Sequence, residues 1–206
     1  MQSLTIKVAS REELGKKATK DFRKDGMVPG VIYGGEDTVH FTVAENDLRP
    51  VVYTGDFFKV IIDVDGNAYE TILKDIDFHP VTDRILHIDF QQLVAGRRVR
   101  TEIPIKIQGD SPGVRSGGKL QQKLRKLKVR VTPENLVDHL VADITGLNLG
   151  DSVKVRDIEV GDIEVLNPGS NPVASVVVPR ALRSADAKAE PEAETAGEEA
   201  AEAPAE

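Results

Sequence analysis

Two histidines and a carboxylate stand where they could act together. His87 and Asp89 are two residues apart in an alternating segment, so a strand there would place both side chains on one face. With His79 they could ligate a metal, although the spacing fits no standard ligand pattern and no fourth ligand is evident. The pair could instead exchange hydrogen bonds with base edges and 2′-hydroxyls, or be an exposed polar pair.

A second candidate is the segment 113–119, Gly-Val-Arg-Ser-Gly-Gly-Lys, which has the spacing of a phosphate-binding P-loop. The match ends at Leu120, where a P-loop carries the Ser or Thr that binds magnesium. The following residues alternate like a strand, so no helix N-terminus would point at a phosphate. A metal- or nucleotide-dependent enzyme is therefore the weaker alternative. We expect no catalytic residue, no metal ligand and no cofactor, and the lack of cysteine excludes thiolate sites.

A third candidate is a short basic helix between Gly15 and Gly26. At about 100° per residue, five Lys and Arg side chains fall within an arc of about 120°. These residues are Lys16, Lys17, Lys20, Arg23 and Lys24. Ala18 and Phe22 fall on the opposite side, where they could pack on a core, and Gly26 followed by Pro29 would end the helix. Such a face is either solvated or, with suitable neighbours, a surface for the phosphates of folded RNA.

The elements that must position these groups are mainly strands. Alternation of apolar residues predicts strands at 4–8, 28–33, 38–43, 57–64, 68–73 and 85–93, and, beyond residue 96, within 97–108, 123–131, 153–155, 163–166 and 172–178. Asp65-Gly66 predicts a hairpin turn, and Glu45 to about Tyr53 a short helix containing Pro50. The segment 133–140 predicts a turn and a short helix. The fold class is mainly β with minor α, beginning with a small antiparallel β-barrel.

Composition divides the 206 residues into three parts. We expect a β-barrel domain at 1–95, a C-terminal β domain at 96–183 and a disordered acidic Ala/Glu/Pro tail at 184–206. Their net charges are −5, +5 and −7, so a nucleic acid would have to be bound by local basic patches, which occur in 7–24 and 97–130. No apolar run reaches the about 18 residues of a membrane span, and no signal-peptide pattern opens the chain, so we expect a cytoplasmic protein.

An ordered set of motifs runs along the chain. Its N-terminal members are Gly15-Lys16, Arg23, Gly26, Pro29, Tyr33-Gly34-Gly35, His79-Pro80 and His87-Ile88-Asp89-Phe90. Together they resemble the bacterial large-subunit ribosomal protein L-twenty-five family. The segments 109–118 and 143–152 resemble its two-domain form, often called the Ctc or general-stress type. The resemblance covers about residues 4–180.

The resemblance implies a six-stranded barrel that binds 5S rRNA in the central protuberance of the large ribosomal subunit. Neighbouring large-subunit ribosomal proteins and 23S rRNA are the further partners it suggests, with no membrane and no small-molecule substrate. A stress-induced protein that joins the ribosome conditionally is the alternative within the family.

In the family, a short helix enters a groove of an internally looped RNA helix, where distorted grooves make base edges accessible. Lys and Arg would position the backbone, and Tyr33, His87 and Asp89 would read shape or edges. The positions taken as RNA-binding are Arg11, Lys16, Thr19, Lys20, Arg23, Tyr33, Lys74, His87 and Asp89.

Overall fold

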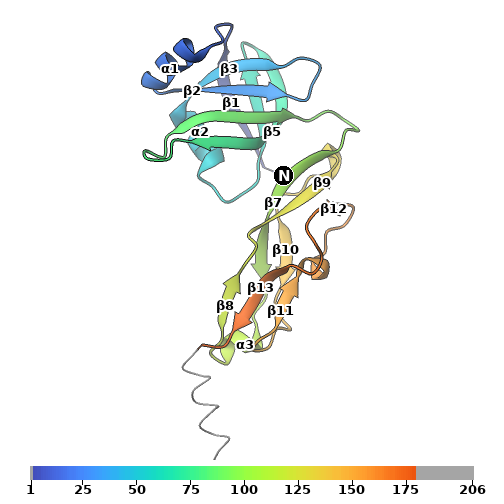
Figure 1. Ribbon diagram of the computed structural model, residues 1–206. Coiled ribbons are helices and arrows are strands. Elements are labelled where there is room, and N and C mark those ends of the chain that lie inside the picture. Colours follow the sequence, from blue (N-terminus) through green and yellow to red (C-terminus); the bar gives the residue numbers. More distant parts are fainter. Residues whose placement is uncertain (1, 180–206) are drawn as a thin grey trace, which may run out of the picture. The chain divides into compact units, whose positions relative to one another are not determined.

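Six strands close into a barrel in the N-terminal part of the protein (Figure 1). The computed structural model describes residues 2–179, so the predicted tail at 184–206 lies outside the described residues. The barrel strands are β1 (Ser3–Ser10), β2 (Met27–Tyr33), β3 (Val39–Ala44), β4 (Lys59–Val64), β5 (Asn67–Phe78) and β6 (Ile85–Gln92). Their order around the barrel is β1-β3-β2-β6-β5-β4, which confirms the predicted six-stranded barrel.

Two of the strand pairs are parallel, which corrects the prediction of a purely antiparallel barrel. β1 runs parallel to β4 and β2 runs parallel to β6, whereas the other neighbouring pairs are antiparallel. A tight turn such as Asp65-Gly66 forces the strands it joins, β4 and β5, to be antiparallel. The two parallel pairs are joined through several other elements, so no local turn fixes their direction and alternation alone could not reveal it.

Alternation within the strands sends one set of side chains into the barrel. Along β4, Val60, Ile62 and Val64 are buried while the residues between them are half-exposed. Phe41 and Phe90 pack against each other with their ring centroids 6.1 Å apart. The barrel core comprises Ile6, Val8, Val28, Ile32, Phe41, Val43, Leu48, Val51, Val60, Ile62, Val64, Ile85, Ile88 and Phe90.

Two helices accompany the barrel. Helix α2 (Glu45–Val52) contributes Leu48 and Val51 to the core and contains Pro50, as predicted. Helix α1 (Lys16–Lys24) lies beside β2 and buries none of its residues fully (Figure 1). It ends where the sequence indicates, because the Asp25 amide donates to the last-turn carbonyls and Gly26 adopts a left-handed φ of 75°.

The described chain beyond residue 95 is also mainly β, which confirms the predicted fold class. One sheet has the order β10-β7-β9-β12 and contains β7 (Val99–Gln108), β9 (Lys126–Val131), β10 (Leu140–Asp143) and β12 (Glu164–Val165). The other has the order β11-β13-β8 and contains β8 (Lys119–Gln122), β11 (Ser152–Lys154) and β13 (Pro172–Val177). The remaining elements are the short helix α3 (Pro112–Arg115) and the 3₁₀ turns Pro133–Asn135 and Val155–Asp157.

The described residues form two compact units. The first comprises the chain up to Ile105, Lys126–Leu140 and Val160–Asn167, and contains the whole barrel. The second comprises Lys106–Arg125, Val141–Glu159 and the described chain from Pro168 onward. The predicted domain limits at 95/96 and 183/184 stay predictions. None of the helices within residues 2–179 is long and apolar enough to cross a membrane.

Gly30 allows β2 to pass close over the barrel core. A Cβ at this position would lie 2.8 Å from Phe41 Cε2 and 2.9 Å from Ile88 Cγ2, and both of those side chains are fully buried. We therefore expect Gly30→Ala to lower the free energy of unfolding by about 1–3 kcal/mol, measured by urea denaturation. Gly55→Ala is the matched control, because a Cβ there meets no atom within 4 Å. Equal effects of the two substitutions would contradict the steric explanation.

Candidate nucleic-acid interface

Helix α1 presents its lysines to solvent and turns its arginine toward the barrel. Lys16, Lys17, Lys20 and Lys24 are exposed, whereas Arg23 is half-buried. Ala18 and Phe22 are half-buried too, on the side predicted to pack against a core. The predicted basic face is therefore present, and Arg23 lies at its edge, where the exposed side of the helix meets the barrel.

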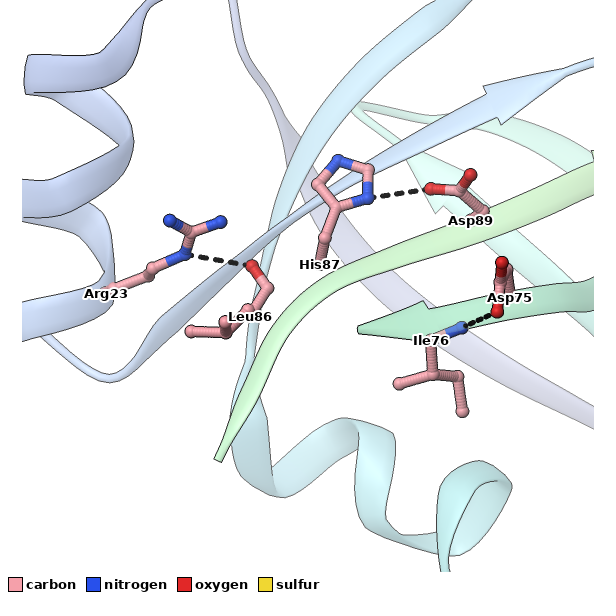
Figure 2. A network of polar contacts seen from close by, with 6 residues as sticks. All are labelled: Arg23, Asp75, Ile76, Leu86, His87 and Asp89. Atoms are coloured by element: carbon pink, nitrogen blue, oxygen red, sulfur yellow. Dashed lines mark hydrogen bonds and ion pairs between the residues drawn. The ribbon is translucent and has the colours of Figure 1, made fainter. Parts of the chain in front are cut away.

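Arg23 connects α1 to β6. Its Nε donates a hydrogen bond of 2.9 Å to the backbone carbonyl of Leu86, the residue before His87 (Figure 2). Figure 2 also shows the two terminal nitrogens of the guanidinium pointing away from Leu86. The sequence predicts the basic helix near the start of the barrel and His87 near its end. This bond holds the helix beside that histidine.

His87 and Asp89 form the predicted pair on the outer face of β6. The His87 Nδ1 lies 2.7 Å from the Asp89 Oδ1, and about one third of each side chain is exposed, 31% and 34% respectively. The contact occupies one nitrogen of the ring and one oxygen of the carboxylate. This contact leaves the Nε2 of the imidazole for a partner.

Tyr33 and Asp75 complete this face. Val31 of β2 lies opposite Asp89 of β6, and Asp75 of β5 lies opposite Asp89 from the other side. Burial raises the pKa of the Tyr33 phenol above its ordinary value, and the negative charges of Asp89 and then Asp75 raise it further. The phenol and both carboxylates therefore share one environment. Asp75 is not among the residues predicted from the sequence, because its position opposite Asp89 depends on a shift of register.

That shift involves Lys74. The β5–β6 pairing shifts register between Leu73 and Asp75 and skips Lys74, whose Nζ donates a bond of 2.7 Å to the Arg100 carbonyl. The ammonium of this predicted RNA-binding residue is therefore engaged by a backbone carbonyl rather than by the Asp75–Asp89 carboxylates.

Arg11 and Thr19 support the start of α1. Arg11 Nη1 donates to Thr19 Oγ1 at 3.4 Å, and Thr19 Oγ1 donates to the Gly15 carbonyl at 2.7 Å. The Arg11 amide donates to the His40 carbonyl, which ties the segment before the helix to β3. Of the predicted site residues, the structure thus gathers α1 with Arg11 and Thr19, and it gathers Tyr33, His87 and Asp89. The Arg23–Leu86 bond joins the two groups.

Local hydrogen bonds and packing account for the two alternative sites, the metal site that includes His79 and the P-loop-like segment 113–119. Among residues 2–179, no group of three or more His, Asp or Glu is arranged to hold a metal, and His79 Nδ1 accepts the amides of Val81 and Thr82. In the P-loop-like segment, a Cβ on Gly113 would lie 2.6 Å from the Asn148 carbonyl carbon, so the loop is packed against protein. A strand, β8, follows this segment as predicted.

The shared environment of Tyr33 can be tested by titration. We expect Asp75→Asn to lower the pKa of Tyr33 because one of two nearby negative charges is removed. The measurement is a spectrophotometric titration in a Tyr53→Phe/Tyr69→Phe background, which leaves one of the chain's 3 tyrosines. Asp47→Asn on α2 is the control, and an equal pKa in both variants would contradict the arrangement.

The raised pKa of Tyr33 also makes the stability of the folded protein depend on pH. The folded protein holds the Tyr33 proton more tightly than the unfolded chain, whose phenol has its ordinary pKa of about 10. The protonated Tyr33 therefore contributes to the free energy of unfolding below about pH 10. This contribution is lost as the pH rises through the raised pKa of Tyr33 in the folded protein.

Comparison with known proteins identifies the family. The profile of the Ribosomal L25p family matches residues 6–90, and that of the C-terminal domain of ribosomal protein TL5 matches residues 98–180. A protein of Cytophaga hutchinsonii named "Large ribosomal subunit protein bL25" is 42% identical over 189 residues, which cover 92% of this chain and 98% of the relative. Relatives with the same name occur in Phocaeicola vulgatus, 41% identical over 92% of this chain and 99% of the relative, and in Christiangramia forsetii, 42% identical over 88% and 84%. The chain belongs to the Ribosomal L25p family and is a structural protein of the large ribosomal subunit, not an enzyme.

Proposed function

We propose that the chain binds 5S rRNA in the central protuberance of the large ribosomal subunit, through α1 and the outer face of β2, β5 and β6. The observation that carries this proposal is the Arg23–Leu86 hydrogen bond, because it holds the lysines of α1 beside the His87–Asp89 pair. Membership of the family gives the setting, the cytoplasmic ribosome.

Helix α1 is suited to the RNA backbone. Its four lysines are exposed, and lysine ammonium groups bind phosphates by neutralising their charge and releasing counterions. A helix this short can enter a groove that an irregular internal loop has opened, whereas the major groove of regular A-form RNA is too narrow and deep. Because residues 1–95 carry a net charge of −5, attraction to RNA depends on this local patch.

The strand face is suited to hydrogen-bond donors rather than phosphates. Asp75 and Asp89 repel phosphate but accept hydrogen bonds from exocyclic amines and 2′-hydroxyls. The His87 Nδ1 lies against Asp89, so the other ring nitrogen, Nε2, is left to meet the RNA. Tyr33, whose pKa is raised above its already high ordinary value, is a phenol at neutral pH and offers an O–H donor. Phosphates would therefore be bound by α1, and base edges or riboses by β2 and β6.

We propose different roles for the two parts of the chain that the two family profiles match. We assign RNA binding to a domain spanning residues 1–95, which contains the barrel, and a separate docking role to a domain spanning 96–183. The net charge of +5 in residues 96–183 favours contacts with 23S rRNA or with acidic surfaces of neighbouring large-subunit ribosomal proteins.

The partner can be tested directly with the full chain and 5S rRNA in gel-shift titrations. We expect binding that weakens as salt rises, that is lost when the internal loop is replaced by regular duplex, and that is unchanged by deletion of residues 184–206. An unrelated RNA hairpin of the same size is the control. Equal affinity for that hairpin would contradict specific recognition, and loss of binding on tail deletion would contradict the placement of the site.

The role of Arg23 can be tested by substitution. We expect Arg23→Ala to weaken 5S rRNA binding about tenfold or more, because α1 loses the charge-assisted bond that positions it and the RNA loses a cation. Arg49→Ala on the exposed side of α2 removes the same charge from the same barrel and is the matched control. Indistinguishable affinities for the two variants would contradict the proposal.

A further inference from the structure

A groove of about 410 Å³ lies between α1 and the turn that joins β5 to β6. Its cationic walls are Lys20, Arg23 and Lys24 from the helix and Arg84 from the turn, and its apolar floor includes Met27 and Leu86. Neither His87 nor Asp89 lines it. The groove is therefore a feature separate from the pair on the strand face, and Arg23 and Leu86 lie at the border between the two.

The groove is strongly cationic. Four positive side chains line it against a single carboxylate, Glu45. Within the part of the chain that the structure describes, neither Lys20 nor Arg84 has a side-chain partner. Lys24 is paired only with the exposed Asp21 on its own helix, at 2.8 Å, a contact that solvent screens and a ligand can replace. An anion is the ligand that this balance of charge favours.

The turn that forms one wall is held by its own backbone bonds. The His79 amide donates to the Arg84 carbonyl at 2.8 Å, and the Asp83 amide donates to the His79 carbonyl at 3.0 Å. His79 Nδ1 accepts from the amides of Val81 and Thr82, which makes Nδ1 the unprotonated nitrogen and Nε2 the donor of the neutral ring. The backbone that carries His79 and Arg84 is thus fixed before any ligand arrives, which reduces the entropy lost on binding.

The floor favours a ligand larger than a phosphate. Met27 and Leu86 are half-buried, and Val28 and Ile85 beneath them are buried, so the base of the groove is apolar. Its volume falls within the range of about 300–1,000 Å³ typical of small-ligand sites. A cationic rim over an apolar floor suits the two halves of a nucleotide, because Lys and Arg neutralise a phosphate and the flat apolar face of a base can pack on Met27 and Leu86.

We propose that this groove holds one unstacked nucleotide of the bound RNA, with its phosphate at the cationic rim and its base on the apolar floor. The inference rests on the proposed binding of 5S rRNA and adds a specific requirement to it. A regular duplex keeps its bases stacked and cannot supply such a nucleotide, whereas an internal loop can.

Two substitutions test the groove in different ways. Thr82→Trp fills it without changing the charge, since Thr82 is an exposed lining residue whose backbone amide still bonds to His79. Val81→Trp is its control, because Val81 is 82% exposed and does not line the groove. Arg84→Ala removes a rim cation, with Arg49→Ala as its control.

The full-length variants are titrated with 5S rRNA at several salt concentrations, and the 2′-hydroxyl reactivity of each nucleotide is mapped in the complexes. We expect Thr82→Trp and Arg84→Ala each to weaken binding about tenfold and both controls to bind like the unsubstituted chain. Arg84→Ala also reduces the slope of log affinity against log salt by about one. In the Thr82→Trp complex, one nucleotide protected by the unsubstituted chain becomes reactive while the others stay protected.

The outcomes separate the two proposals. If the unsubstituted chain does not bind 5S rRNA, the proposed function itself fails. If the chain binds and His87→Ala weakens binding, but Thr82→Trp and Arg84→Ala match their controls, only the groove inference is overturned. If Arg84→Ala alone weakens binding, the groove contacts a phosphate from outside and the nucleotide inference is overturned as well.

Discussion

The hydrogen bond from Arg23 to the Leu86 carbonyl ties the basic helix to β6. Helix α1 has 9 residues, too few to be stable alone in water, and none of its side chains is fully buried. Its position depends on the half-buried Ala18 and Phe22 and on this bond from a charged donor. Because the bond ends on the residue before His87, the contact that holds the helix also sets its place beside the strand face (Figure 2).

The strand face itself breaks a rule of sheet stability. Asp75 lies directly opposite Asp89, and like charges in this position destabilise a sheet. Asp75 Oδ1 accepts the Ile76 amide at 2.9 Å, and the phenol of Tyr33 lies in the same negative field with its pKa raised. Two carboxylates that lower the stability of a sheet are expected at a site where a partner binds to them. Hydrogen-bond donors of an RNA groove would relieve the repulsion that the free protein retains.

The sequence predicted the parts of the barrel better than their assembly. Period-two alternation located β4 and β6, Asp65-Gly66 located a hairpin, and Gly26 located the end of α1. The helical arc also placed the lysines together, but Arg23 at its edge could equally have faced solvent, since nothing local shows that a carbonyl 63 residues away accepts its bond. The skipped Lys74 and the parallel β1–β4 and β2–β6 pairs were likewise hidden, because register and strand direction are set by closure of the whole barrel.

In the proposed complex, affinity and specificity have different origins. The lysines of α1 would attract any RNA backbone, although the net charge of −5 in residues 1–95 opposes indiscriminate binding. The carboxylates of the strand face penalise phosphates and accept only hydrogen-bond donors, and the groove accepts only an unstacked nucleotide. Since Arg23 lies at the border of the strand face and the groove and holds the helix that carries the lysines, an RNA must satisfy the lysines, the strand face and the groove at one spacing. Regular duplex satisfies the lysines alone, so shape rather than charge would select the partner.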